Sequence, residues 1–543
     1  MNGELSGGTN GVMNETKPGP EEPINGEKTG EMKEPHTYYG IRKPEPMHFE
    51  TADIVLAFGM LIIGFLYWNL IRIDSLGLGV TLFAAVLWGA ASVYFRISGI
   101  KQTRAGLLAS GVFLLSAVNF VLFDITLIKG LNFIFISLAF VFWVLVTAGK
   151  RLEEKISLYA ISDMFYQLLV IPFTNFSGCF SGIRQVFAKS KRGKGVLSGI
   201  LGILIFLPVL VMVITLLSSA DAAFEGIIDH IRFSVSENLF EYLFQIILGL
   251  PVACYLYGML YGNRYQRNTG NVTLESVNKN LDFFRFAPGV TVYSAMTALN
   301  LIYLVFFLAQ ASYLFSAFEG SLPQTMTYAE YARRGFFELC AVSAINLAVI
   351  AGAHLIAKRD RVKVLRGETI ALCIFTIALL ATAMSKMGMY ISYYGLTQLR
   401  VYTSWFMVLL LAFFIIILLR QFKSFQGTQA ALVSFLILFM VLCYGNIDGL
   451  IAKYNIERYQ AGTLESVDLE SMSYLSDAAV PELYRLYQET EDEGFKKDIK
   501  AAILGNLYEE HSGSVAAVSF RDFNLQSYQA DAIRNTLTEA GAN

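Results

Sequence analysis

Long runs of apolar residues constrain the fold of this chain more than any other feature. Each run is close to the roughly 20 residues that an α-helix needs to cross about 30 Å of hydrocarbon. The chain is therefore expected to be all-α: a polytopic bundle of about eleven transmembrane helices with a small helical C-terminal extramembrane domain. The predicted spans are Ile54–Ile71, Leu76–Phe95, Ala105–Phe123, Leu131–Gly149, Val196–Leu217, Phe240–Tyr261, Val290–Gln310, Gly335–Ala357, Thr369–Met389, Val401–Leu419 and Ala430–Tyr444.

Composition agrees with a membrane protein and argues against several other classes. Of the 543 residues, 55% are hydrophobic and only 16% are charged, whereas soluble proteins carry roughly 25% charged residues. No segment is strongly basic overall, so nothing indicates a nucleic-acid interface. The five cysteines lack the spacing of a metal site or a disulfide framework, so we expect small buried residues.

The basic residues predict which way the chain crosses the membrane. Lys and Arg gather in the N-terminal tail and in alternate loops, the largest group between residues 150 and 194, and the intervening loops carry few. Under the positive-inside rule, this asymmetry indicates a cytoplasmic N-terminus. Eleven spans then put the C-terminus outside. We expect a multi-pass protein of the bacterial plasma membrane.

The regions between and around the spans differ in character. Residues 1–50 are rich in Pro, Gly and Glu and are predicted to be a disordered cytoplasmic tail. The spans fall into a four-helix segment (51–149) and a seven-helix core (196–445). Between them, in the 150–195 loop, Ile156–Pro172 is apolar but contains Asp163 and has basic residues on both sides. We expect an amphipathic helix on the anionic inner leaflet; the alternative is a re-entrant or spanning segment.

The last hundred residues have the composition of a soluble domain. Residues 445–543 hold 17 acidic and 8 basic residues. Apolar residues recur at helical spacing in Val480–Tyr487 and Ile499–Tyr508, and more weakly in Gln526–Leu537. We therefore predict an acidic, extracytoplasmic domain of three or four helices over residues 446–543.

Four strings in the sequence resemble a known family. They run from Ser218 to Phe224, from Tyr328 to Glu338, from Tyr394 to Arg400 and from Asn446 to Ile456. Together they resemble the signatures of bacterial membrane proteins grouped as domains of unknown function 4153 and 4173, over roughly residues 150 to 530. The resemblance implies a multi-span bacterial membrane protein and supplies no activity.

All four strings fall on the predicted outer face, which suggests a polar vestibule there. On a helix, Glu330, Arg334 and Glu338 form an i, i+4, i+8 ladder with Arg333 beside it. One interpretation is that this ladder binds an ion or ligand; the other is that it only fixes the start of the helix. The other charged candidates near this face are Asp221, for which capping a helix is the alternative, Lys386 and Arg400.

Polar residues inside the predicted spans are the remaining candidates: Asn119, Asn300, Asn346 and His354. Residues of this kind usually make hydrogen bonds between helices, and a transport path is the alternative. Gly258-x-x-x-Gly262 is consistent with close helix contacts. Pro251 interrupts its span, as in some transporters, although proline is also ordinary in spanning helices.

No recognisable catalytic motif accompanies these residues. The sequence has no H-E-x-x-H, no G-x-x-x-x-G-K-[ST] and no G-x-S-x-G pattern, so we expect no catalytic residues, no bound metal and no cofactor. We favour a non-enzymatic sensor or regulatory protein, working with a signalling protein partner. The alternative is a transporter or channel for a small solute or ion.

Overall fold

The computed structural model describes residues 46–148, most of 152–187, scattered positions between 199 and 226, and residues 237–267, 274–319, 336–358, 361–505 and 519–542. Met1–His48 and Phe49–Asn543 are separate units, and the helices below all belong to the second. The predicted disordered tail therefore lies almost wholly outside the described residues.

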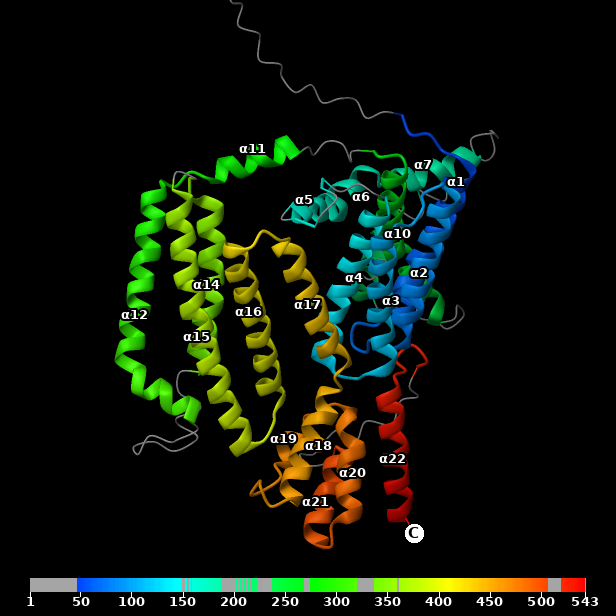
Figure 1. The fold of residues 1–543 in the computed structure, drawn as a ribbon. Helices are drawn as coiled ribbons and strands as arrows, with labels where there is room; N and C mark the ends of the chain where they lie inside the picture. Colours follow the sequence, from blue (N-terminus) through cyan, green and yellow to red (C-terminus); the bar gives the residue numbers. More distant parts are fainter. Residues whose placement is uncertain are drawn as a thin grey trace, which may run out of the picture. The chain divides into compact units, whose positions relative to one another are not determined.

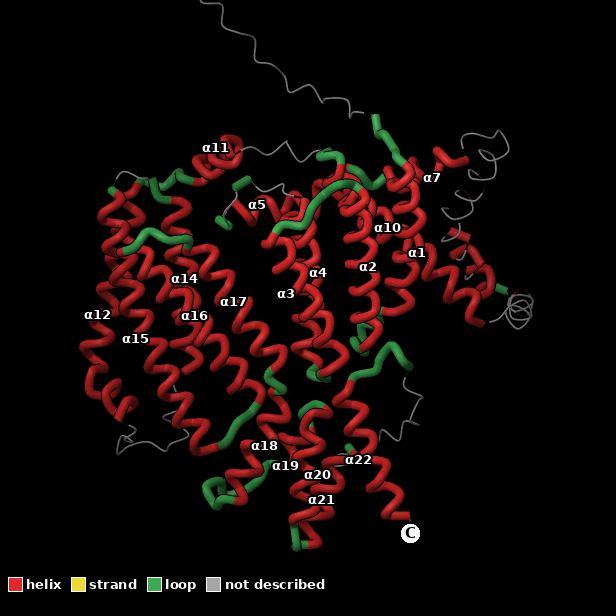
Figure 2. Tube along the Cα trace, turned by 45° about the vertical axis from the view of Figure 1, so that its right-hand side comes forward, coloured by secondary structure: helices red, strands yellow, loops and turns green. Residues whose placement is uncertain are grey.

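Helices and loops make up the described ranges, as Figure 2 shows. Within these described ranges, ten helices are long and apolar enough to cross a membrane, and they correspond to ten of the eleven predicted spans. The other predicted span, Val196–Leu217, lies largely outside the described residues. The ten are α1 (Thr51–Leu70), α2 (Leu78–Ile97), α3 (Arg104–Leu122), α4 (Thr126–Ala148), α10 (Glu237–Arg264), α12 (Gly289–Glu319), α14 (Phe336–Ile356), α15 (Val362–Tyr394), α16 (Gln398–Phe422) and α17 (Gly427–Tyr444).

Helices α1 to α4 and α10 form what we call the first bundle. Its most extensive contact joins α1 to α10, although the sequence assigns these helices to different membrane segments. Small residues permit the approach: a Cβ atom on Gly64 would lie 2.2 Å from the carbonyl oxygen of Gly249. The first and sixth predicted spans are thus direct neighbours.

Helices α12, α14, α15 and α16 form the second bundle, shown in green to yellow in Figure 1. Its core contains fully buried side chains such as Leu372, Met407 and Phe414. Helix α17 packs against α16 and also against α3 and α4, so it joins the two bundles.

The predicted interfacial segment is helical but not a simple amphipathic helix. It consists of α5 (Tyr159–Phe165), a π-helical turn η1 (Tyr166–Val170) and α6 (Ile171–Thr174), followed by α7 (Gly178–Phe187). Its second half packs against α10, where a Cβ on Gly258 would lie 2.3 Å from the carbonyl oxygen of Pro172. The Gly258-x-x-x-Gly262 pattern therefore lies at a close contact between α10 and this segment. Cys179 on α7 is buried and unpaired, as are the other four cysteines, in agreement with the sequence.

A third helical group, the C-terminal domain, follows α17 directly. Its elements are α18 (Ile447–Gln460), α19 (Leu469–Ser473), the 3₁₀ turn η2 (Asp477–Ala479), α20 (Val480–Glu489), α21 (Glu493–Leu504) and α22 (Leu525–Ala542). The described part of this domain has four longer helices, α18, α20, α21 and α22, with the five-residue α19 after the first of them. The string from Asn446 to Ile456 falls at the start of α18. Figure 1 shows these helices at the end of the bundles opposite to α7 and α11 (Leu274–Phe284).

Candidate functional site

Two of the four sequence strings interlock where the second bundle meets the C-terminal domain. The backbone N–H of Leu396 donates to Oδ1 of Asn455 (2.7 Å), and Nδ2 of Asn455 donates to the carbonyl of Leu396 (2.8 Å). Gly395 lies directly before this pair with φ +76°, and a Cβ there would approach Asn455 Oδ1 to 2.4 Å. Only glycine satisfies both the backbone conformation and the close approach. The amide pair therefore fastens α18 to the turn between α15 and α16.

Asp448 reinforces this junction from the first turn of α18. Its side chain is fully buried, and Nε2 of Gln398 lies 2.9 and 3.0 Å from its two carboxylate oxygens. The backbone N–H of Ser476 donates to the same carboxylate at 2.8 Å. A negative charge is favourable at a helix N-terminus, and buried carboxylates need such donors. One side chain thus holds together α16, α18 and the segment before η2.

Two arginines satisfy the last carbonyl groups of α15, which have no partner within the helix. Arg458 of α18 donates to the carbonyl of Ser392 (2.7 Å), and Arg400 donates to that of Tyr394 (3.0 Å). The Arg400 guanidinium also lies over the Tyr390 ring, 4.2 Å from its centre. Positive charge at a helix C-terminus is favourable. Arg400, a predicted vestibule residue, is thus engaged with the end of α15.

The segment before α22 forms a second junction, with the loops of the first bundle. The backbone N–H of Gly79 donates to the carbonyl of Arg521 (2.8 Å), and Nδ2 of Asn524 donates to Oδ1 of Asp124 (3.1 Å). The C-terminal domain therefore touches the loops after α1, α3 and α15, so these loops share one face. The sequence predicts this shared face from their low content of basic residues.

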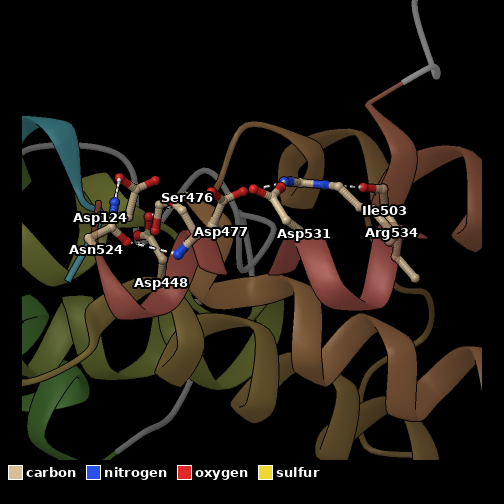
Figure 3. Close-up of polar contacts among 9 residues, drawn as sticks. Asp124, Asp448, Ser476, Asp477, Ile503, Asn524, Asp531 and Arg534 are labelled. Carbon is tan, nitrogen blue, oxygen red and sulfur yellow. Dashed lines mark hydrogen bonds and ion pairs between the residues drawn. The ribbon is translucent and has the colours of Figure 1, made fainter. Parts of the chain in front are cut away.

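Figure 3 shows how these contacts continue into the C-terminal domain. Arg534 of α22 forms ion pairs with Asp477 (2.5 Å) and Asp531 (3.1 Å) and donates to the carbonyl of Ile503. Burial alone would lower the pKa of Arg534, but the nearby charge of Asp477 and its hydrogen bond raise it. The guanidinium stays charged, so it links η2, α21 and α22 by charge-assisted bonds.

The other predicted vestibule residues do not all come together. Lys386 is buried, and the Glu338 carboxylate lies close enough to interact electrostatically with its ammonium group. Asp221 accepts a hydrogen bond from the backbone N–H of Phe224 (2.9 Å), which is the bond of a capping residue. Three predicted residues lie outside the described part of the chain: Glu330, Arg333 and Arg334.

Each predicted intramembrane polar residue has a hydrogen-bond partner. Nδ2 of Asn119 donates to the carbonyl of Cys443 (2.6 Å), which links α3 to α17. His354 lies 3.2 Å from the Thr369 hydroxyl. The remaining two, Asn300 and Asn346, contact α15.

These two asparagines belong to a polar seam along α15, which we define by Glu368, Thr376 and Lys386. Asn300 donates to the Glu368 carboxylate at 2.7 Å, and Nδ2 of Asn346 donates to the hydroxyl of Thr376 at 2.9 Å. Glu368, one residue before the predicted span, was missed because it was counted with the loop.

A family model for "Domain of unknown function (DUF4153)" matches residues 109–486, which is more than half of the chain. The chain belongs to the DUF4153 family. No curated protein and no solved structure matches it.

The DUF4153 match contains all four strings found in the sequence, including both partners of the Leu396–Asn455 pair. The match, over residues 109–486, begins and ends earlier in the chain than the range of roughly 150 to 530 that the strings suggested. The described residues of this DUF4153 protein contain no group of three or more His, Cys, Asp or Glu side chains arranged to hold a metal ion. What the junction offers is a set of hydrogen-bonded and charged contacts between the membrane helices and the C-terminal domain.

One buried polar network of this DUF4153 protein escaped sequence reasoning altogether. Asp53, at the start of α1, is fully buried and accepts hydrogen bonds from Tyr94 (2.7 Å), Arg264 (2.8 Å) and Tyr265 (2.7 Å); Arg264 also pairs with Glu50. Partial burial, and then the hydrogen bond to Asp53 and its charge, raise the pKa of Tyr265, which keeps this phenol a donor. The predicted first span began one residue later, and Arg264 was counted among the loop cations.

Proposed function

We propose that this DUF4153 protein is a non-enzymatic regulatory membrane protein whose C-terminal domain reports a signal to the membrane helices. The observation that carries the proposal is the interlock of Asn455 with Leu396, supported by Asp448 and Gln398. A domain held by buried, directional bonds at the ends of α15 and α16 transmits its own displacement to those helices. A signal that shifts it changes the equilibrium between two arrangements of the second bundle.

The topology belongs to the same proposal. With the basic loops facing the cytoplasm of a bacterium, the C-terminal domain lies outside the plasma membrane. The basic 150–195 loop then contacts anionic lipids of the inner leaflet. A cytoplasmic signalling protein receives the output at that face.

The experiment compares Gly388, inside α15, with Gly395, which follows the last residue of that helix. In a deletion strain of the source organism, we would express the wild type, Gly395→Ala and Gly388→Ala, and compare transcript profiles. Gly395→Ala introduces a Cβ 2.4 Å from Asn455 Oδ1 at a positive φ, whereas a Cβ at Gly388 meets nothing within 4 Å. We expect Gly395→Ala to reproduce the deletion profile and Gly388→Ala to restore the wild-type profile.

Transport is the second candidate, because polar contacts follow α15 from Glu368 to Lys386. This stretch of helix is roughly 27 Å long at 1.5 Å per residue, close to the hydrocarbon thickness of about 30 Å. Polar groups inside a bundle often mark ion or substrate paths. If Asn346→Leu reproduced the deletion phenotype while Gly395→Ala behaved as wild type, the regulatory proposal would fail and transport would replace it.

A further inference from the structure

A cavity of about 490 Å³ lies within the first bundle. Its walls come from α1, α2, α3, α4 and α10, and one side is closed by residues of η1 and α6 and the turn that follows. The volume falls in the range of roughly 300–1,000 Å³ that is typical of small-molecule sites. The cavity is separate from the junctions of the C-terminal domain.

The lining selects for an apolar occupant. It is formed almost entirely by aliphatic and aromatic side chains, among them Phe83, Phe113 and Phe140. Two of the few hydroxyl groups in the wall are already bonded to backbone carbonyls: Ser137 to Phe133 (2.9 Å) and Tyr255 to Leu168 (2.8 Å). An apolar cavity of this kind does not hold water well and accepts hydrocarbon instead.

The dimensions fit one hydrocarbon chain. On α4 the lining extends from Phe133 to Val141, and on α10 from Pro251 to Met259. Each stretch covers roughly 12 Å along its helix axis, slightly less than half of the hydrocarbon thickness of about 30 Å. The walls belong to spanning helices, so the apolar molecule at highest concentration around them is the membrane lipid itself.

One cation, Arg267, lies beside one end of the cavity. Phe173 and Phe176 both line the cavity, and Asn175 between them accepts a hydrogen bond from Nε of Arg267 (3.1 Å). Arg267 lies three residues after the end of α10, and Arg184 is exposed on α7, a helix that packs against α10. Cations at the end of an apolar slot match the phosphate of a lipid headgroup.

We propose that this cavity is a specific lipid site, in which one acyl chain of an anionic phospholipid fills the slot and its headgroup faces Arg267. The helical segment from Tyr166 to Thr174 forms the wall that separates this lipid from bulk lipid. The inference is independent of the proposed regulatory function, since it needs only the first bundle.

The test is photo-crosslinking of the full-length protein in vesicles. Vesicles of phosphatidylcholine would contain a small fraction of phosphatidylglycerol with a photoreactive acyl chain, and cross-linked peptides would be identified by mass spectrometry. We expect the cross-links to concentrate on residues 133–141 and 251–259. The variant Ala84→Phe fills the cavity, because Ala84 is a buried residue of its wall. In this variant the yield of those cross-links should fall several-fold.

The matched control is Ala298→Phe, the same substitution at an exposed position of α12. It should leave cross-linking in the first bundle unchanged. Ser137→Leu is a second filling variant, so that misfolding of Ala84→Phe, detected by size-exclusion chromatography, leaves the test intact. Arg267→Gln should keep the chain in place but lower the preference for phosphatidylglycerol over labelled phosphatidylcholine several-fold.

Two outcomes would overturn the proposal. Cross-links spread evenly over all lipid-facing helices, and insensitive to both filling variants, would mean that the lipid is only annular. If Arg267→Gln left the preference for phosphatidylglycerol over phosphatidylcholine unchanged, the proposal that Arg267 selects an anionic phospholipid would be wrong.

Discussion

The two membrane bundles hold their helices together in different ways. In the first, α1 and α10 approach through Gly64 and Gly249, and a buried ion pair between Asp53 and Arg264 closes one end. In the second bundle, side chains such as Asn346 form hydrogen bonds from neighbouring helices to α15. Packing of small residues depends on shape, whereas interhelical hydrogen bonds in lipid are individually weak. The difference suggests a rigid first bundle and a second bundle that is easier to rearrange.

The strongest test of this contrast is Asp53→Ala. The Arg264 side chain is only 10% exposed, and the substitution removes its buried partner. Breaking a buried pair by removing one member costs about 3–5 kcal/mol. We expect the free energy of unfolding, measured by denaturant titration in lipid nanodiscs, to fall by that amount.

Asp74→Ala is the matched control, because Asp74 lies in the exposed loop after the same helix. It should change the free energy of unfolding by less than about 0.5 kcal/mol. If the two substitutions cost the same, the buried pair does not hold the first bundle together.

Gly64→Ala comes next in expected size. Its Cβ would lie 2.2 Å from the Gly249 carbonyl oxygen, so α1 and α10 must separate. Overpacking of this kind costs about 1–3 kcal/mol. In Gly59→Ala, on the same helix, the Cβ meets nothing within 4 Å. Unfolding in nanodiscs should show a loss for the first variant and none for the second; equal effects would mean that α1 and α10 do not need their close contact.

The sequence predicts the membrane helices well because each has to satisfy its own backbone in lipid. Ten of the predicted spans appear as helices, and the low content of basic residues predicts that the loops after α1, α3 and α15 share a face. The sequence does not predict that α1 packs on α10. That contact depends on Gly64 and Gly249, which are far apart in the chain and belong to no recognised motif.

For the candidate site too, the sequence predicts the residues but not the contacts between them. The sequence strings marked both Gly395 and Asn455, yet nothing in them says that these residues meet. Asp53 and Glu368 were missed for a different reason: each lies within a residue of a predicted span boundary and was assigned to the loop. Boundary carboxylates of this kind are therefore worth including when intramembrane polar residues are sought.

The smallest expected effect is that of Asn346→Leu in the second bundle. The substitution removes the acceptor of the Tyr303 hydroxyl (2.7 Å), while the Thr376 hydroxyl keeps its bond to the carbonyl of Leu372 (2.7 Å). Interhelical hydrogen bonds in membranes are worth about 0.6 kcal/mol on average, because the separated helices find other partners. A loss of that order in nanodisc unfolding, well below that of Gly64→Ala, would support the contrast between the bundles. A loss equal to that of Asp53→Ala would reverse it, since the second bundle would then depend on its polar bonds as strongly as the first depends on its ion pair.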